Sequence, residues 1–305
     1  MKHIFGPVPS RRLGRSLGVD LVPFKTCSYD CIYCQLGKTT CKTIRRREWI
    51  PLDEVLEELK EKLDSKPDYI TLSGSGEPTL YSRLDEIIAG IRSMTNIPVA
   101  VLTNGSLLWK KDIRALLMEA NLIIPSLDAG SPLLFESVNR PHPGIPFDTM
   151  LGGLKALRSE FHGEYWLKVL LTGGYTAVDA EVRKIAEHVK AIKPDRVQLN
   201  TVTRPPAEQF ALGVSRECLE RFAGFFEPHA KVIADFRAIH SAPDFTAARE
   251  SVLELVRRRP CSVEDIANGL GIHRNEAVKY LEELLASKSI ERANSGDKTF
   301  FRKST

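Results

Sequence analysis

The stretch DEVLEELKEKLDSKPDYITL, residues 53–72, contains one unit of a pattern that recurs along most of this 305-residue chain. Apolar side chains recur at helical spacing over about 53–64, and the short apolar run at 69–72 then has the length and composition of a buried strand. The same order of helix and strand returns in five further pairs of segments. They lie at about 81–93 and 99–102, 108–119 and 122–124, 148–160 and 167–171, 178–192 and 196–199, and 215–227 and 232–234.

Short apolar strands that alternate with helices predict right-handed βαβ units and a parallel sheet covered by helices. A further strand is predicted at 16–22, where polar and apolar side chains alternate. About six such units predict an α/β protein whose sheet forms a partial or complete barrel over residues 1–240. In that architecture functional side chains gather just after the carboxyl ends of the strands, so we expect the site there.

The pattern changes near His240, and no strand–helix pair follows it. Ser241-Ala242-Pro243-Asp244 has the composition of a linker, which we place at 241–247. The sequence then predicts three helices, with a tight turn between the second and third, and a short hairpin. The helices lie at about 248–258, 262–269 and 273–287, and the hairpin turns around 294–297. This order predicts a small winged helix-turn-helix domain over 248–305.

The composition, 43% hydrophobic and 27% charged, is ordinary for a soluble globular protein. No apolar run approaches the length of about 20 residues that a helix needs to cross a bilayer. The first residues lack the apolar stretch and the small-residue cleavage site of a secretory signal, so we expect a cytoplasmic protein with no membrane partner. The formal net charge of +4 is too small to indicate a nucleic-acid partner without a local basic patch.

Three of the six cysteines lie within one short run, Cys27-Ser28-Tyr29-Asp30-Cys31-Ile32-Tyr33-Cys34. In a reducing compartment such clustering indicates metal binding or catalysis before it indicates a disulfide framework. Three thiolates on one loop can bind a single metal centre and leave one of its positions open. Structural zinc with a distant fourth ligand, or three unrelated thiols, are the alternatives. Zinc sites usually pair two C-x2-C arms, however, and the chain has no second arm.

This C-x3-C-x2-C run, with the aromatic Tyr33 just before its last cysteine, resembles the signature of radical S-adenosylmethionine (SAM) enzymes, and the resemblance extends over about 5–236. It implies that Cys27, Cys31 and Cys34 hold one 4Fe–4S cluster, with the amino and carboxylate groups of SAM on the open iron and Tyr33 beside the cofactors. It also implies an oxidoreductase in which an electron breaks a carbon–sulfur bond of SAM, giving methionine and a 5′-deoxyadenosyl radical. An electron donor such as flavodoxin or ferredoxin is then an expected partner.

A glycine-rich turn, Ser73-Gly74-Ser75-Gly76-Glu77-Pro78, directly follows the predicted strand at 69–72. Glycine lets the backbone approach a ligand closely, and a carboxylate can accept a hydrogen bond from an ammonium group. By itself such a turn is as often only a connection between a strand and a helix. Because it ends the strand that follows the cysteines, Ser75-Gly76-Glu77 resembles the Gly-Gly-Glu motif with which the family holds the SAM amino group.

Short polar side chains also end the next two predicted strands, in Thr103-Asn104-Gly105-Ser106 and Pro125-Ser126-Leu127-Asp128. Such side chains can hydrogen-bond the ribose hydroxyls of SAM, and the family uses the end of its fourth strand in this way. The resemblance assigns that role to Ser126, with Asp128 and Asn104 as further cofactor-binding candidates. Helix capping or turn stabilisation is an equal alternative for Asn104 and Asp128.

Basic residues occur before the first predicted strand, in Ser10-Arg11-Arg12-Leu13-Gly14-Arg15, and after the cysteines, in Arg45-Arg46-Arg47. Arginine forks suit phosphate or carboxylate ligands, but a run of charges is as often a solvated face. Lys168 lies inside an apolar strand, where a salt bridge and a substrate contact are both open interpretations. Cys41 lies closer to the predicted site than the other two remaining cysteines and is a candidate redox or substrate-linked thiol.

The stretch Phe5-Gly6-Pro7-Val8-Pro9-Ser10-Arg11-Arg12-Leu13-Gly14 resembles a group of radical SAM proteins related to the enzymes that build wyosine on transfer RNA. Gly76-Glu77-Pro78-Thr79-Leu80 strengthens that kinship. Wyosine-building enzymes carry three further cysteines upstream of the signature for a second cluster. No cysteine precedes Cys27, so we expect a single cluster and an activity other than wyosine synthesis.

The predicted winged helix leaves the partner open. Residues 249–305 contain 11 lysines and arginines against 9 aspartates and glutamates, a formal net charge of +2, whereas strong phosphate binding usually needs a concentrated positive face. Nucleic acid, peptide and protein are therefore all candidate partners.

Two classes of function follow from these motifs. The first is an enzyme that modifies an unidentified substrate, with RNA or a peptide or protein favoured. The second is an iron–sulfur sensor that regulates transcription through the winged helix. The glycine-rich and polar strand-end motifs favour the enzyme, because a sensor needs no SAM pocket.

Overall fold

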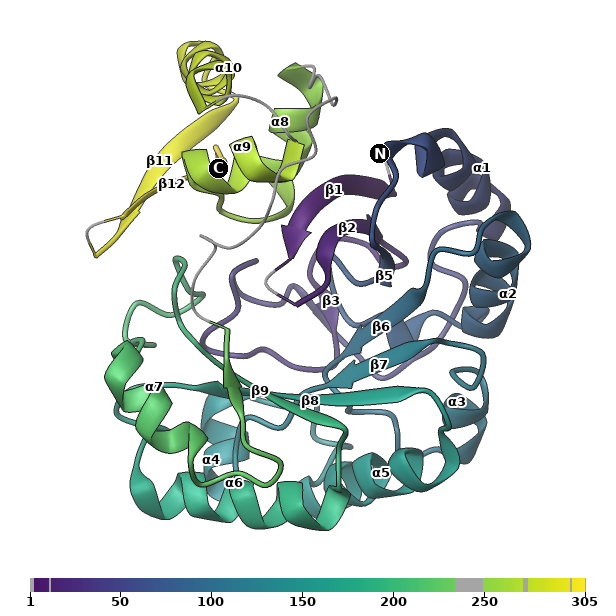
Figure 1. Cartoon of the computed structure of the whole chain (residues 1–305), viewed down its shortest axis with the longest axis vertical. Helices are drawn as coiled ribbons and strands as arrows, with labels where there is room; N and C mark the ends of the chain where they lie inside the picture. The colour runs from purple at the N-terminus through teal and green to yellow at the C-terminus, as the bar shows by residue number, and fades with distance from the viewer. Residues whose placement is uncertain (1–2, 11, 234–248, 271–273, 297, 305) are drawn as a thin grey trace.

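The computed structural model describes residues 3–10, 12–233, 249–270, 274–296 and 298–304. One curved sheet of eight strands dominates these residues (Figure 1). In order across the sheet the strands are β1 (Ile4–Ser10), β2 (Gly14–Val19), β5 (Tyr69–Leu72), β6 (Val99–Thr103), β7 (Leu122–Pro125), β8 (Glu164–Leu171), β9 (Arg196–Thr201) and β10 (Lys231–Val232). Neighbours from β2 to β10 are parallel, and β1 is antiparallel to β2. The predicted α/β class with a parallel sheet is confirmed, and the sheet is open between β1 and β10.

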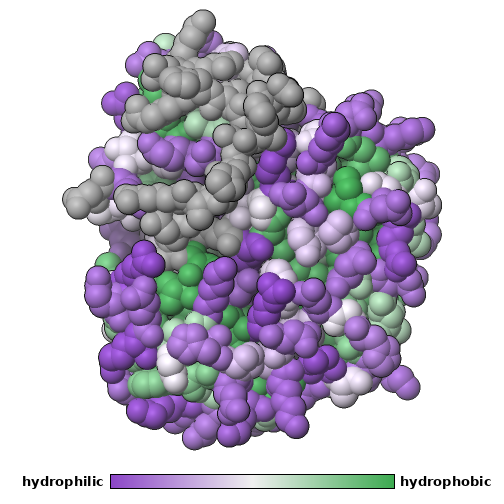
Figure 2. Space-filling model, viewed as in Figure 1, coloured by the Kyte–Doolittle hydropathy of each residue, from purple (hydrophilic) through white to green (hydrophobic). Residues whose placement is uncertain are grey.

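Helices cover the convex face of the sheet, whereas loops and two short strands, β3 (Thr26–Cys27) and β4 (Cys41–Lys42), lie on the concave side (Figure 1). In α2, Leu84, Ile87 and Ile91 are buried at the helical spacing that puts them on one face. Figure 2 shows hydrophilic residues spread over the outside, with hydrophobic residues between them in small groups. The helices of this layer are α1 (Leu52–Lys62), α2 (Leu84–Met94), α3 (Lys111–Ala115), α4 (Pro132–Val138), α5 (Phe147–Glu160), α6 (Asp179–Ile192) and α7 (Arg216–Ala223).

A second group of elements, the C-terminal unit, consists of α8 (Arg249–Arg258), α9 (Val263–Leu270), α10 (Arg274–Ala286) and the antiparallel hairpin β11 (Ile290–Ser295) and β12 (Lys298–Lys303). Figure 1 shows α8 and α9 beside β1, and their buried apolar side chains form one cluster with Phe5 and Val8 of that strand. Three helices and a hairpin follow each other in the predicted order. The assignment as a winged helix-turn-helix domain stays a prediction, and the predicted linker at 241–247 lies outside the described residues.

Strand β1 was not among the predicted elements, because Pro7 and Pro9 weaken the pattern of a strand. The structure places β1 at one edge of the sheet, where it pairs only with β2. An edge strand has one side without ladder hydrogen bonds, so it tolerates residues that lack a backbone N–H.

The helix predicted over 108–119 is also shorter in the structure, where α3 covers Lys111–Ala115. The Arg114 guanidinium donates to the carbonyl oxygens of Leu108 and Trp109, at 2.9 and 3.1 Å. These carbonyls would accept backbone N–H groups in a longer helix, so the side chain replaces the first turn. The short helix α4 was missed because it lies in what the sequence presents as a connection.

Among the described residues, no helix combines the length and the apolar character that a bilayer-crossing segment requires.

Candidate cluster and SAM site

The cysteine loop, which we define as residues 27–34, lies on the concave side of the sheet and is fixed by backbone hydrogen bonds to the end of α4 and to the segment after it. The carbonyl oxygen of Ser28 accepts from the N–H of His142 at 2.8 Å, and the N–H of Ile32 donates to the carbonyl of Val138 at 3.0 Å. The structure thus brings all three predicted cysteines together on one anchored loop, with each side chain partly exposed.

The three thiols influence one another. Burial raises the pKa of Cys27 well above its usual value, and the charges of Glu77 and Cys31 raise it further. Burial and the neighbouring Cys34 raise the pKa of Cys31 to about 12, and burial also raises the pKa of Cys34. Thiols in this state keep their protons until a metal centre compensates the charge of the thiolates.

Three cysteines on one loop suit a four-iron cluster, which needs three thiolates and keeps one iron open. In the part of the chain that the structure describes, no three His, Cys, Asp or Glu side chains stand close enough to hold one ion. Tetrahedral zinc would need its thiolates at about 2.3 Å from a common centre. A four-iron cluster takes each thiolate on a different iron, which sets the sulfurs further apart.

Two side-chain amides point at the cysteine sulfurs. The Nδ2 of Asn104 lies 3.5 Å from the Sγ of Cys27, and the Nδ2 of Asn139 lies 3.6 Å from the Sγ of Cys31. Amide donors stabilise thiolate charge, and hydrogen bonds to sulfur tune the potential of an iron–sulfur cluster. The set of three cysteines and two amides therefore fits a cluster held by Cys27, Cys31 and Cys34.

Glu77 follows β5 and is buried beneath the end of β6. Its Oε1 accepts from the hydroxyls of Thr79 and Thr103, at 2.6 and 2.5 Å, and its Oε2 accepts from the backbone N–H of Asn104 at 2.7 Å. Burial raises the pKa of Glu77 even though these donors oppose the shift. A cation beside this carboxylate would offset the cost of its burial.

The glycine-rich turn is joined to the start of the cysteine loop. Gly76 pairs with Thr26 in a parallel bridge, and the N–H of Glu77 donates to the carbonyl of Thr26 at 3.1 Å. A Cβ on Gly76 would overlap that carbonyl, so only glycine permits this approach. Ser75 instead faces the sheet, where its N–H donates to Oδ1 of Asp20 at 2.9 Å and its hydroxyl donates to Oδ2.

Asn104 combines a turn-stabilising role with contact to the cysteine loop. Its Oδ1 accepts from the N–H of Ser106 at 2.9 Å. This hydrogen bond stabilises the turn, which is the role that the sequence analysis gave as an alternative to cofactor contact. Its Nδ2, besides approaching Cys27, donates to the hydroxyl of Ser28 at 2.9 Å.

The end of β7 carries the two remaining candidates. The Oδ1 of Asp128 accepts from the N–H of Leu170 at 2.8 Å, and its Oδ2 accepts from the Tyr33 hydroxyl and from Nδ2 of Asn139. Asp128 is thus used to fix Tyr33 and the end of β8. Ser126, by contrast, has a hydroxyl without a hydrogen-bond partner among the described residues.

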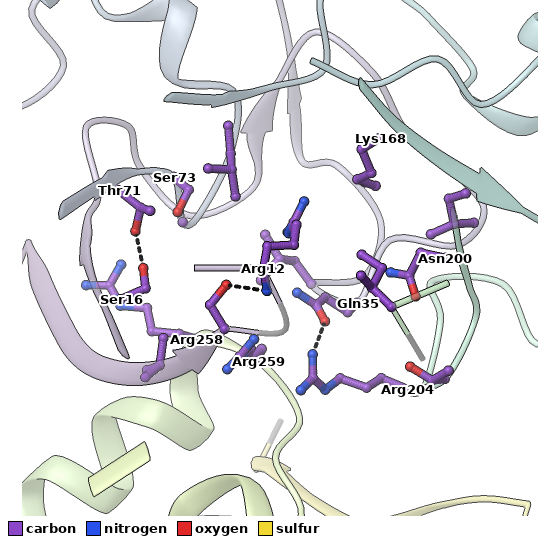
Figure 3. A pocket seen from close by; sticks show the side chains of 18 of the residues that line it. Arg12, Ser16, Gln35, Thr71, Ser73, Lys168, Asn200, Arg204, Arg258 and Arg259 are labelled. Atoms are coloured by element: carbon purple, nitrogen blue, oxygen red, sulfur yellow. Dashed lines mark hydrogen bonds between the residues drawn. The ribbon is translucent and has the colours of Figure 1, made fainter. Parts of the chain in front are cut away.

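A cavity of about 330 Å³ opens on the concave side and is bordered by Tyr33 and Cys34 of the cysteine loop. Figure 3 shows Lys168 at one end of it and Arg258 and Arg259 at the opposite side, where the chain leaves α8. The C-terminal unit therefore supplies part of the cavity wall.

Sequence reasoning missed four residues at this site: Asn139, Arg204, Arg258 and Arg259. Asn139 and Arg204 carry no local signal, because long-range packing brings Asn139 to Cys31 and Arg204 to the cavity. Arg258 and Arg259 belong to a run of arginines at the end of a helix, which is a pattern that also fits a solvated face.

The arginine run after the cysteines has a structural role. Arg46 donates to the carbonyls of Thr79 and Tyr81, at 3.0 and 2.9 Å, and the Arg47 guanidinium stacks 3.7 Å from the centroid of the Trp49 ring. Cys41 is exposed on β4.

The family model of the radical SAM superfamily matches residues 21–189 of the chain. A UPF0026 protein of Helicobacter pylori (strain J99) is 33% identical to it over 304 residues, which cover 98% of this chain and 96% of that protein. A protein of Brachyspira hyodysenteriae named GTPase Obg is 40% identical over 294 residues. That match covers 95% of this chain but 43% of the other protein, so the chain spans less than half of that relative.

Among solved structures, a radical SAM methyltransferase from Sphaerobacter thermophilus has a TM-score of 0.55 with this chain. The likeness covers 73% of this chain and 67% of that one at 17% identity, so it concerns the fold alone. Residues 21–189, which the family model matches, contain the cysteine loop, the glycine-rich turn and the ends of β6 and β7. The chain therefore belongs to the radical SAM superfamily and to the UPF0026 family of proteins.

Proposed function

We propose that this chain is an enzyme that cleaves SAM reductively, with one 4Fe–4S cluster held by Cys27, Cys31 and Cys34. The superfamily typically binds this cluster and SAM. One observation carries the proposal. Gly76 and Glu77 are bonded to Thr26, the residue directly before Cys27, so Glu77 and the loop with the three cysteines are held together on the concave side of the sheet.

When bound, the cluster and SAM supply a one-electron chemistry that breaks a carbon–sulfur bond and yields methionine and a 5′-deoxyadenosyl radical. The residues of the chain bind and orient these groups. Glu77 would accept hydrogen bonds from the SAM ammonium group, because a cation would stabilise its buried carboxylate. Asn104 and Asn139 donate to the thiolates of Cys27 and Cys31.

The remaining candidates act around this pair. Gly76 keeps the turn close to the cysteine loop, and Ser75 ties that turn to Asp20. The Ser126 hydroxyl is available for a ribose hydroxyl. Asp128 acts as a positioning residue that holds the Tyr33 side chain beside the cysteines.

Three further parts of the proposal concern the context of the enzyme. The electron comes from a cytoplasmic donor such as flavodoxin or ferredoxin. The C-terminal unit recruits the substrate as a winged helix-turn-helix domain. The kinship to wyosine-building enzymes concerns ancestry and not activity, because no cysteine precedes Cys27.

The test is SAM cleavage by anaerobically reconstituted full-length protein after chemical reduction, measured as 5′-deoxyadenosine by chromatography. We expect slow 5′-deoxyadenosine formation without substrate, and none with a Cys31→Ser variant. Cluster-loaded, reduced protein that never forms 5′-deoxyadenosine would contradict the enzyme and favour the iron–sulfur sensor.

A further inference from the structure

The cavity beside the cysteine loop is lined by five cationic side chains and, among the described residues, by no aspartate or glutamate. The five come from separate parts of the chain: the turn between β1 and β2, strand β8, the segment after β9 and the end of α8 (Figure 3). They are Arg12, Lys168, Arg204, Arg258 and Arg259.

Two of these cations are accounted for by neighbouring groups. Lys168 lies 5.9 Å from the centroid of the Tyr33 ring, and its charge lowers the pKa of Cys34 against the opposing effect of burial. Arg258 forms an ion pair with Asp20 and donates to the hydroxyl of Ser75 at 3.1 Å. It ties the C-terminal unit to the glycine-rich turn.

The other three, which we call the arginine cluster, line the same cavity. Burial and, to a smaller extent, the charge of Arg259 lower the pKa of Arg12 to about 10. Burial and the same Arg259 lower the pKa of Arg204 to about 10. Arg259 is thus near both of the other guanidinium groups.

The arginine cluster has a surplus of positive charge. Its one ion pair among the described residues joins Nη2 of Arg204 to Oδ2 of Asp265, at 3.4 Å. Arg259 donates to the backbone carbonyl of Pro9 at 3.3 Å, and no described carboxylate pairs with it or with Arg12. Arg204 is thus paired with Asp265, whereas Arg12 and Arg259 contribute about two positive charges that no described carboxylate compensates, at a partly buried site.

Buried like charges without counter-ions are unfavourable, so they persist where a ligand neutralises them. The planar guanidinium fork matches phosphate oxygens in pairs. A phosphate monoester carries a charge of about −1.5 to −2 at neutral pH, which equals the surplus. A single carboxylate would neutralise only half of it.

We propose that Arg12, Arg204 and Arg259 bind the phosphate group of a small phosphorylated substrate. The proposal rests on the SAM-cleaving function above and adds the class of substrate to it. The cavity of about 330 Å³ is closed on one side by the C-terminal unit, so it suits a small molecule with a terminal phosphate. A nucleic acid would need an open basic surface that follows its backbone. This substrate class replaces the RNA or peptide favoured on sequence grounds.

The test uses cluster-loaded full-length protein, saturated with SAM and without reductant, titrated with inorganic diphosphate in a calorimeter. One site is expected. Arg12→Gln and Arg259→Gln should each weaken diphosphate binding about tenfold or more, since each removes charge-assisted hydrogen bonds. Arg257→Gln, an exposed arginine on the same helix end, removes the same charge and should change the affinity less than about twofold.

Three outcomes would overturn the proposal. Equal weakening by Arg257→Gln would reduce the effect to general charge. Competition between diphosphate and SAM would assign the arginine cluster to the SAM carboxylate. Tighter, Arg12-dependent binding of a single-stranded RNA oligonucleotide would assign it to nucleic acid. None of these measurements involves SAM cleavage, so a failure of the proposed function would appear separately, as missing 5′-deoxyadenosine.

Thermal unfolding distinguishes a binding role for Arg12 from a structural one. In phosphate-free buffer Arg12→Gln should leave the midpoint unchanged or raise it, because the variant removes a buried cation from a surplus of cations. Diphosphate should raise the midpoint of the unaltered protein more than that of the variant. A lowered midpoint together with no stabilisation by diphosphate in the unaltered protein would show a structural role and contradict the proposal.

Discussion

The cysteine loop and the arginine cluster border the same cavity but are assembled in opposite ways. The cysteines come from a single run, residues 27–34, and backbone hydrogen bonds hold that run on both sides. The arginines come from positions 12, 204 and 259, which only the fold brings together. The first site is encoded by local spacing and the second by tertiary packing.

The two regions also differ in how their charges are compensated. Next to the cysteine loop, the Glu77 carboxylate accepts from two threonine hydroxyls and two backbone N–H groups. In the arginine cluster, the Asp265 carboxylate pairs with Arg204, and no described carboxylate pairs with Arg12 or Arg259. The Glu77 carboxylate already accepts hydrogen bonds from the protein, so it is fixed in place and suits one particular ligand. Guanidinium groups without a counter-ion instead depend on a ligand to neutralise their charge.

The largest expected effect concerns the cysteine loop. Cys27→Ser, Cys31→Ser and Cys34→Ser should each lose the cluster, because three thiolates are the minimum for one open iron. Reconstituted protein should contain about four irons per chain and each variant close to none, as measured by iron analysis and visible absorption. Cys218→Ala is the matched control, since that cysteine lies on α7. Unchanged iron content in any of the three variants, or stoichiometric zinc, would contradict a cluster held by the cysteine loop.

Glu77→Gln should weaken SAM binding about tenfold to a hundredfold, because a charge-assisted hydrogen bond contributes about 1.5–3 kcal/mol. The amide keeps the volume of the side chain, so the cluster should remain. Glu187→Gln changes an exposed glutamate on α6 and should leave the affinity unaltered. Equilibrium binding of SAM to cluster-loaded protein measures the affinity of the unaltered protein and of both variants. An unaltered SAM affinity in Glu77→Gln would remove this residue from the site.

The affinity for SAM should also fall as the pH is lowered. Burial raises the pKa of Glu77 in the free protein, and the SAM ammonium would lower it again, so binding expels a proton. Between the two pKa values the affinity rises with pH, by at most about tenfold per unit. Glu77→Gln has no such proton and should show a flat profile in this range. A profile of equal slope in the variant would assign the dependence to another group.

The glycine-rich turn supports the cysteine loop, so Gly76→Ala should lower both the stability of the protein and its iron loading. The added Cβ would overlap the Thr26 carbonyl, so the turn must move, at a cost of about 1–3 kcal/mol in the free energy of unfolding. Iron loading should fall with it, because Thr26 directly precedes Cys27. Gly152→Ala is a sharp control. A Cβ at Gly152, on α5, meets nothing within 4 Å, and alanine should stabilise the helix by about 0.5–1 kcal/mol. Equal midpoints of unfolding for the two variants would contradict the close approach.

These two regions also show how much the sequence could predict. The repeated helix–strand pairs predicted the parallel sheet, since apolar periodicity is a local property. The cysteines, Glu77 and Asn104 were predicted because each follows a strand or forms a motif. Asn139 was missed, because its approach to Cys31 depends on the position of a short helix that the sequence does not signal.

The arginine cluster shows the same limit more strongly. Arg12 was noted as one of two basic runs, and its function stayed open between ligand and solvent. Arg12 and Arg46 differ in their surroundings in the fold. Arg46 donates hydrogen bonds to backbone carbonyls, whereas Arg12 lies near the cation of Arg259 at the cavity. No local pattern contains that difference, because it depends on the packing of the C-terminal unit against β1.

The smallest expected effect is that of Asp265→Asn, which alters the one described carboxylate paired with the arginine cluster. Asp265 and Ser262 form a reciprocal cap at the start of α9, with the Asp265 carboxylate accepting from the Ser262 N–H at 2.9 Å and the Ser262 hydroxyl accepting from the Asp265 N–H at 3.1 Å. Asparagine keeps an oxygen for this cap but removes the negative charge that Arg204 faces at 3.4 Å. The midpoint of thermal unfolding should therefore fall in phosphate-free buffer, because the buried Arg204 guanidinium loses a carboxylate that pairs with it. Diphosphate should bind about three- to tenfold more tightly than to the unaltered protein, and should restore more of the midpoint, because the Asp265 carboxylate no longer competes with it for Arg204. Weaker diphosphate binding in Asp265→Asn would mean that the carboxylate orients Arg204 for the ligand and does not compete with it, and the charge surplus would then not be the basis of the site.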